Sequence, residues 1–285
     1  MSETSNVKVA ILGLGIIGEA WARNLEVDGI PLALWNRTKK ERPLVVADPV
    51  EAVRGATHII VVVADREAVK GVIDRIAPVL RPGQLVIQSS TITPEAVRDA
   101  ARIVTSVGAS FLDAPFTGSK PAAEARETVF YVGGDEETIA AARPVLTRLS
   151  KAILPIGPIG AASALKLAMN LNIAGVAQTL CESLSLARSA GIHDDVYFSA
   201  LRLNVSNSGV VALKERLIRE QDYAPQFSVK HMYKDIRQAK EVADKRYFPV
   251  LERLLEVYEA GTGRGFSDDD FISLIRLLER PKIGG

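Results

Sequence analysis

In the first half of the chain, hydrophobic residues come in short unbroken runs, separated by longer stretches of mixed polarity. Continuous apolar runs of this length predict strands buried on both faces, here residues 7–12, 32–35, 58–63 and 85–88. The spacing in the other stretches predicts helices over residues 19–28, 49–55, 66–80 and 94–107. Strands that alternate with helices predict a parallel sheet with right-handed crossovers. Residues 110–114 and 128–133 are expected to add edge strands to this sheet.

The second half of the chain has helical periodicity. Residues 161–190 contain no proline and one glycine, Gly175, and are apolar on almost every side, which predicts one long buried helix. The Pro- and Gly-rich segment before it, residues 155–160, is typical of a domain junction. Loops are expected near residue 191 and over residues 204–209, 223–226 and 261–265. The sequence therefore predicts an α/β N-terminal domain (residues 1–159) and an all-α C-terminal domain (residues 160–285), joined by the long helix.

The composition fits two globular domains and excludes several classes of function. The 285 residues include 35 basic and 34 acidic side chains, and a net charge of +1 gives no overall field for nucleic acid or an anionic membrane. A single cysteine, Cys181, excludes an intrachain disulfide and a cysteine-based zinc site. Residues 1–6 are polar and glycines interrupt the apolar run after them, so we expect no signal peptide and no transmembrane span. A soluble cytoplasmic protein is expected.

The histidines do not point to metal chemistry. His58, His193 and His231 lack the spacing of metal ligands, and the patterns HExxH, CxxC and GxSxG do not occur. We therefore predict no metal site and no nucleophile-elbow hydrolase. His58, at the start of a predicted strand, is interpreted as a structural residue.

A glycine-rich turn follows the first predicted strand and opens a helix: Gly13-Leu14-Gly15-Ile16-Ile17-Gly18. Glycines there permit a tight turn and a close backbone approach, so that a pyrophosphate can bind the free N–H groups at the helix start. The alternative is a chance glycine turn, but the strand-then-helix context is the one that a dinucleotide-binding motif requires.

The second predicted strand ends at Asn36-Arg37-Thr38, where an acidic residue would bind the ribose hydroxyls of NAD. Arginine and polar side chains suit a 2′-phosphate instead, and Lys39, Lys40 and Arg42 follow closely. We therefore predict NADP(H) as the cofactor. The alternative is a solvated basic loop.

Two further segments leave alternatives open. The small-residue loop from Asp113 to Ser119 can bind a carboxylate through its N–H groups and hydroxyls, or it can be an ordinary turn. Lys166 and Asn170 lie four residues apart on one face of the long helix, in an apolar stretch. A buried lysine needs a partner and a reason, whereas a lysine near a helix start can extend its amine to water.

Together these motifs resemble the β-hydroxyacid dehydrogenase family over roughly residues 7–278. The resemblance rests on GLGIIG at residues 13–18, NRT at 36–38, DAPFTGS at 113–119, GAASALKLAMN from Gly160, and FSVKHMYKD at 227–235. The string TGSKPAAE at residues 117–124 is most similar to the glyoxylate and succinic semialdehyde reductase branch. In that branch the NRT segment corresponds to NADP selection.

The resemblance implies a Rossmann domain plus a helical domain, usually in homodimers or homotetramers, and it implies roles for individual residues. Lys166 would give a proton to the carbonyl oxygen, with Asn170 beside it. The substrate would be bound by Thr91, Thr117, Gly118 and Ser119 at its carboxylate end, with Phe227 and Asp235 closing the pocket. The cofactor would be contacted by the glycine turn, Asn36, Arg37, Thr38, Val63, Ala64, Thr91 and Lys234.

Three features depart from the family pattern. Thr117 stands where serine is usual, which adds a methyl group to the pocket. Leu171 replaces the second asparagine of the lysine helix, with Asn172 one step further round. Residues 39–47 are shorter than the family's segment by most of a helix, which predicts an open crossover and a more exposed adenosine end of the cofactor.

The predicted activity is reversible hydride transfer from NADPH to the aldehyde carbon of a short oxo acid, with Lys166 as general acid. Because nicotinamide and lysine must face the same carbon, the site is expected between the two domains. One alternative is an imine reductase, since Thr117 and Leu171 are atypical, although such enzymes generally lack the lysine. The other is a non-catalytic binding module, which the joint retention of Lys166, Asn170 and Asp235 disfavours. No nucleic-acid or membrane partner is predicted.

Overall fold

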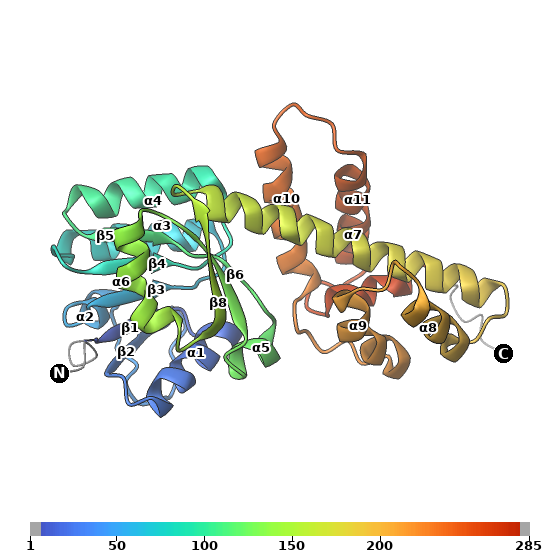
Figure 1. Ribbon diagram of the computed structural model, residues 1–285, viewed down its shortest axis with the longest axis horizontal. Helices are drawn as coiled ribbons and strands as arrows, with labels where there is room; N and C mark the ends of the chain where they lie inside the picture. Colours follow the sequence, from blue (N-terminus) through green and yellow to red (C-terminus); the bar gives the residue numbers. More distant parts are fainter. Residues whose placement is uncertain (1–6, 280–285) are drawn as a thin grey trace. The chain divides into compact units, whose positions relative to one another are not determined.

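The computed structural model describes residues 7–279 (Figure 1), so the prediction for residues 1–6 lies outside the described part. The chain divides into two compact units, Met1–Leu167 and Ala168–Gly285. The division falls inside the long helix α7 (Ala161–Ser189). Within residues 7–279, none of the helices combines the length and the hydrophobicity needed to cross a membrane.

The first unit is built on a sheet whose first five strands are parallel, in the order β2-β1-β3-β4-β5. Those strands are β1 (Val9–Leu12), β2 (Leu32–Trp35), β3 (His58–Val61), β4 (Leu85–Gln88) and β5 (Ser110–Asp113). The helices between them are α1 (Ile16–Val27), α2 (Pro49–Val53), α3 (Arg66–Ile76, extended by the 3₁₀ turn η2, Ala77–Val79) and α4 (Pro94–Ser106). The predicted parallel α/β fold is confirmed.

The sheet has a hydrophobic core on each face. Val9 and Ile11 face one core, whereas Ala10 and Leu12 face the other. Helix α1 and helix α6 (Glu136–Leu146) cover the first face, and α2, α3 and α4 cover the second (Figure 1). Because both faces are covered, these strands are apolar at nearly every position between their ends, which is the pattern that the sequence displays.

The part of the sheet beyond β4 differs from the prediction. Residues 110–114 were expected at an edge, but β5 lies inside the sheet, between β4 and β7 (Thr128–Gly133). Strand β7 pairs with β5 and β6 (Phe116–Thr117) antiparallel and with β8 (Ser150–Gly157) parallel. Strand β8 was not predicted because the Pro- and Gly-rich residues 155–160 indicated a domain junction. An edge strand of a sheet nevertheless tolerates proline. Helices α5 (Lys120–Glu124) and α6 were not predicted either.

The second unit is helical, and the predicted long helix is confirmed as α7. After α7 come α8 (Asp194–Leu203), α9 (Gly209–Glu220), α10 (Val229–Ala243), α11 (Pro249–Gly263) and the 3₁₀ helix η3 (Phe271–Leu277). The loop predicted over residues 261–265 begins later, because α11 continues through Gly261. A Cβ at Gly261 would lie 2.2 Å from Leu274 Cδ2, so this glycine serves close packing and does not end the helix.

An acidic side chain at the end of α1 ties this helix to the rest of the first unit. The carboxylate of Asp28 accepts hydrogen bonds from Arg126 at 2.8 and 2.9 Å and from Arg148 at 3.3 Å. The hydrogen bond from Arg126, helped by that from Arg148, lowers the pKa of Asp28 although burial opposes this. A carboxyl whose folded pKa is lowered stabilises the fold above its ordinary pKa, and the contribution is lost as the pH falls through the folded value.

We therefore expect Asp28→Asn to lower the free energy of unfolding by about 1–2 kcal/mol at pH 7 and by little at pH values below the lowered pKa. The measurement is urea denaturation at several pH values. Asp74→Asn is the matched control, because the ion pair of Asp74 with Lys70 is exposed and should contribute at most a few tenths, roughly, of a kcal/mol. An equal loss for both variants at pH 7 would contradict the expectation.

Candidate functional site

The predicted cofactor residues gather at the carboxyl ends of the parallel strands. Gly13 follows β1, Asn36 follows β2, and Val63 lies just beyond β3. Strand β1 lies between β2 and β3, so the chain connects β1 to a strand on one side of it and then continues with β3 on the other side. The strand order therefore reverses at β1. In open α/β sheets, ligands bind outside the carboxyl ends at such a switch point.

The glycine turn has the geometry of a dinucleotide cradle. Gly13 has a φ of +115°, and a Cβ there would lie 2.2 Å from the Val62 carbonyl oxygen. A Cβ on Gly18 would lie 2.0 Å from the Gly13 carbonyl oxygen, so these two glycines hold α1 against the sheet. Gly15 is different, because a Cβ there would meet nothing within 4 Å. It precedes the first turn of α1, which has no side-chain cap. Exposed backbone N–H groups at a helix start fit a pyrophosphate.

Asn36 joins the glycine turn to the segment after β2. Its Oδ1 accepts a hydrogen bond from the Leu14 N–H at 2.9 Å, and its Nδ2 donates to the Thr38 carbonyl at 2.8 Å. Arg37 and Thr38 are exposed beside this link. The side chain of Asn36 thus places Arg37 next to the turn that would hold a pyrophosphate.

Arg42, one of the basic residues that follow Asn36-Arg37-Thr38, forms ion pairs with helix α1. Its guanidinium forms ion pairs with Glu19 at 2.8 Å and Glu26 at 2.5 Å, both on α1. Residues 39–47 contain no helix, and Arg42 connects this segment to α1. Its charge is therefore already balanced by carboxylates, unlike that of a phosphate-binding arginine.

Residues at the ends of β3 and β4 are bound to one another. The Val63 N–H donates to Ser90 Oγ at 2.8 Å, and the buried Gln88 side chain bonds both backbone groups of Ser90. Ala64 is exposed at this edge and Thr91 is half-buried. Sequence reasoning missed Gln88 and Ser90, although a glutamine that ends an apolar strand was a visible signal.

Asp113, at the end of β5, binds the start of α7. Its carboxylate accepts hydrogen bonds from the Gly160 N–H at 3.0 Å and from Ser163 N–H and Oγ at 3.1 and 2.7 Å. Burial raises the pKa of Asp113 above its ordinary value, although these hydrogen bonds and the charge of Arg98 partly oppose the shift. The loop after it leads to Thr117 in β6, to Gly118 with a φ of +129°, and to the half-buried Ser119. Sequence reasoning used this loop but missed Asp113 and Ser163 as partners.

Lys166 and Asn170 lie one turn apart on α7, and both are buried. The side chain of Lys166 is only 9% exposed, which favours a buried lysine over one that extends its amine to water. In the second unit, Asn170 Nδ2 donates to Asp235 Oδ2 at 2.6 Å, and Lys234 Nζ lies 3.0 Å from Asp235 Oδ1. Three of the predicted site residues are therefore in contact, although Asn170 and Asp235 are 65 positions apart.

Phe227 is held by buried charges that the sequence did not reveal. Its N–H donates to Asp270 at 3.2 Å, and its ring stacks parallel to that of His231. Asp270 is fully buried and pairs with the buried Lys214 at 2.8 Å. This ion pair therefore fixes the backbone that leads into α10 and to Asp235.

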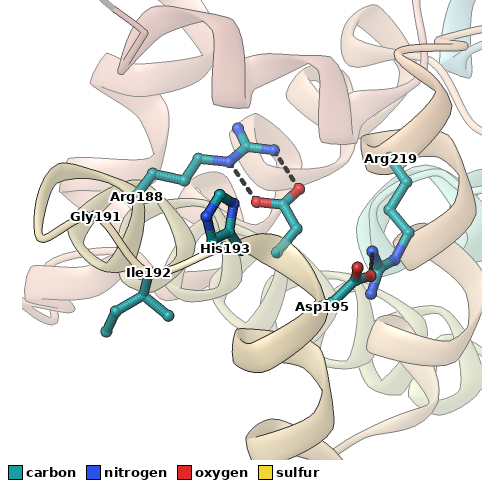
Figure 2. A pocket seen from close by; sticks show the side chains of 7 residues that line it. Arg188, Gly191, Ile192, His193, Asp195 and Arg219 are labelled. Atoms are coloured by element: carbon teal, nitrogen blue, oxygen red, sulfur yellow. Dashed lines mark hydrogen bonds and ion pairs between the residues drawn. The ribbon is translucent and has the colours of Figure 1, made fainter.

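Other polar clusters have structural explanations. Both ring nitrogens of His58 are hydrogen-bonded, to Thr57 and to the Ala141 carbonyl, as a structural histidine requires. A pocket of about 420 Å³ in the second unit is lined by Arg188, Gly191, Ile192, His193, Asp194, Asp195 and Arg219. Figure 2 shows it from close by. Arg188 pairs with Asp194 and Arg219 with Asp195, so the charges of its wall are balanced. Residues 7–279 contain no group of three His, Cys, Asp or Glu side chains that could hold a metal ion.

Comparison with known proteins gives matches along nearly the whole chain. The family model of the NAD-binding domain of 6-phosphogluconate dehydrogenase matches residues 8–157. The model described as the NAD-binding domain of NADP-dependent 3-hydroxyisobutyrate dehydrogenase matches residues 160–278. Glyoxylate/succinic semialdehyde reductase 2, a chloroplastic protein of Arabidopsis thaliana, is 27% identical over 98% of this chain and 82% of its own length.

Solved structures share the fold. The Mycobacterium tuberculosis 3-hydroxyisobutyrate dehydrogenase, solved with L-serine, has a TM-score of 0.87 at 27% identity and covers 96% of this chain and 99% of its own. An imine reductase from Myxococcus stipitatus, solved with NAD⁺, has a TM-score of 0.65 at 21% identity, with coverages of 96% and 99%, and shows the fold alone. The two family models and the relatives indicate the same family, and the glycine turn after β1 fits it. This chain belongs to the β-hydroxyacid dehydrogenase family of nicotinamide-dependent oxidoreductases.

Proposed function

We propose that this protein is an NADPH-dependent reductase of short oxo acids that uses Lys166 as its general acid. The observation that carries the proposal is the burial of Lys166 on the same face of α7 as Asn170, whose amide is fixed by Asp235. A lysine that is kept out of water, beside an oriented amide, fits the protonation of a carbonyl oxygen. The family relationship supplies the reaction class.

The cofactor would be held by the glycine turn and by Asn36, Arg37, Thr38, Val63, Ala64, Thr91 and Lys234. When bound, the nicotinamide supplies a hydride to the carbonyl carbon of the substrate. Lys166 stabilises the negative charge that develops on the carbonyl oxygen and then gives it a proton from Nζ, so that the product is a hydroxyl group. The neutral amine regains its proton from solvent after release. Asp235 orients Asn170, since only Nδ2 of that amide can donate to a carboxylate.

The substrate class follows from the residues assigned to its acid end. Thr91, Thr117, Gly118 and Ser119 have hydroxyl and backbone N–H donors for a carboxylate, and the family resemblance adds Phe227 and Asp235 to the proposed substrate residues. L-serine, the compound named with the M. tuberculosis structure, is also a short acid with a hydroxyl group. We further propose a cytoplasmic protein that works as a homodimer or homotetramer.

A substrate panel tests the proposed class. With NADPH as reductant, we expect turnover on glyoxylate, succinic semialdehyde or tartronate semialdehyde and none on a cyclic imine. Turnover on the imine alone would make the protein an imine reductase. Absence of turnover with every compound, in protein that binds NADPH, would favour the binding-module alternative.

The choice of NADPH depends on Arg37. A hydrogen bond to a charged group contributes about 1.5–3 kcal/mol, so Arg37→Ala should weaken NADPH binding roughly ten- to hundredfold. NADH binding should hardly change. Fluorescence titration with both nucleotides measures the two Kd values.

Arg81→Ala is the matched control, because this arginine is also exposed but precedes the amino end of β4. It should leave both Kd values unchanged. A wild-type preference for NADH, or an unchanged preference in Arg37→Ala, would show that the assignment is wrong.

A further inference from the structure

The carboxylate of Asp113 connects the sheet to the helix that carries Lys166. Asp113 Oδ2 accepts the N–H groups of Gly160 and Ser163 at 3.0 and 3.1 Å, and Oδ1 accepts the Ser163 hydroxyl at 2.7 Å. Gly160 directly precedes α7, and Ser163 lies in its first turn. Both carboxylate oxygens of Asp113, which is completely buried, are therefore used for this one purpose.

The backbone packs closely around Asp113. A Cβ on Gly160, which has a φ of +94°, would lie 2.7 Å from Arg98 Nη1 and 3.2 Å from the Pro94 carbonyl oxygen. A Cβ on Gly133 would lie 2.8 Å from the Pro158 carbonyl oxygen and 3.4 Å from Asp113 Oδ2. Glycines are thus required on both sides of the carboxylate, and the start of α7 is closely packed against the end of β5.

This attachment differs from an ordinary helix cap. At α6, for example, the cap is Asp135, the residue directly before the helix, which accepts the Thr138 N–H at 2.7 Å. Asp113 instead lies 47 positions before Gly160, in a strand of the sheet. A local cap stabilises its own helix, whereas Asp113 also fixes where α7 starts relative to the sheet.

Ser163 and Lys166 are three residues apart on α7 and share one buried face. A constraint on Ser163 therefore sets the rotation and the height of the helix one turn before Lys166. We propose that Asp113 is a positioning residue that acts through Ser163 to fix Lys166 for proton transfer, an inference that rests on the proposed function. Displacement of a reacting group by about 1 Å can lower a rate about a hundredfold.

The test is a double-mutant cycle of Asp113→Asn with Lys166→Met in the full-length protein. Asparagine keeps the size of the side chain but replaces one acceptor oxygen by an NH2 donor, so it cannot accept all three hydrogen bonds in the geometry of Asp113. With saturating NADPH and succinic semialdehyde, or whichever oxo acid gives turnover, we expect Asp113→Asn to lower kcat about 10- to 100-fold. The Kd of NADPH should stay within about twofold, roughly the scatter of additive effects at independent sites. In the Lys166→Met background the same change should have almost no further effect on kcat, because effects of residues that act as a unit are not additive.

Two further variants support the cycle. Ser163→Ala removes only the hydroxyl donor and should lower kcat by a smaller factor, about three- to tenfold, as loss of one such bond implies. It decides the question if Asp113→Asn does not fold. Asp135→Asn, the same change at the local cap of α6, should leave kcat unchanged.

The outcomes separate the two proposals. If Lys166→Met lowers kcat but both Asp113→Asn and Ser163→Ala turn over normally, the positioning role is overturned and the proposed function stands. It is also overturned if Asp113→Asn lowers kcat by the same factor with and without Lys166. If Lys166→Met itself turns over normally, the proposed function fails and the positioning role fails with it.

Discussion

Replacement of Lys166 by methionine should lower kcat by about 10²- to 10⁴-fold, the usual contribution of a positioned general acid. The factor corresponds to roughly 3–5 kcal/mol of activation free energy. Methionine keeps the length and the apolar part of the side chain, so the substitution removes mainly the ammonium group. The variant should stay folded, and its melting temperature is the control for that. Steady-state kinetics and thermal denaturation of the same preparation measure both quantities.

Lys214→Met is a matched comparison, since Lys214 is the other buried lysine among the described residues. Its ammonium group pairs with Asp270 at 2.8 Å, and methionine would leave that carboxylate buried without its cation. Removal of one partner from a buried pair costs about 3–5 kcal/mol, so this variant should lose stability. We thus expect Lys214→Met to lose mainly stability and Lys166→Met to lose mainly turnover. Near-normal turnover in folded Lys166→Met would contradict the lysine mechanism and favour an imine reductase.

Two alanine substitutions in the glycine turn should fail in different ways. Gly18→Ala should lower the free energy of unfolding by about 3 kcal/mol or more, because its Cβ would lie 2.0 Å from the Gly13 carbonyl oxygen. A backbone carbonyl cannot move aside without separating α1 from β1. Gly15→Ala should leave stability unchanged, since its φ of −71° suits alanine and its Cβ would meet no atom within 4 Å.

Gly15→Ala should instead weaken NADPH binding roughly ten- to hundredfold, because the methyl group occupies the space through which a pyrophosphate would reach the N–H groups of α1. Thermal denaturation and nucleotide titration of the two variants separate stability from binding. Gly71→Ala is the control, because Gly71 lies in α3, also with no atom within 4 Å of a Cβ, and should affect neither binding nor the fold adversely. Unchanged NADPH binding in Gly15→Ala would place the pyrophosphate elsewhere.

The elements that the sequence predicted well are those whose burial is uniform. Strands covered on both faces, such as β1 and β2, are apolar at every position, and α7 lacks proline along its whole length. The failures arose where a neighbour distant in sequence decides the outcome. Pro155 is tolerated because β8 pairs only with β7, and Gly261 stays helical because Leu274 packs against it.

The candidate site shows the same division. The positions of the glycine turn and of Asn36 were predictable because these residues directly follow β1 and β2. The bonds of Asp113 to Ser163 and of Asn170 to Asp235 join residues 50 and 65 positions apart. The pattern of hydrophobic residues contains no information on such pairs, since each partner alone is an isolated polar residue in an apolar stretch.

The lysine mechanism is tested most directly by a single-turnover experiment in which enzyme with bound NADPH is mixed with an oxo acid or with a cyclic imine. We expect rapid loss of NADPH absorbance with succinic semialdehyde or glyoxylate, about 10²- to 10⁴-fold slower in Lys166→Met, and none with the imine. Hydride transfer to the imine alone, or a rate that Lys166→Met leaves unchanged, would contradict it.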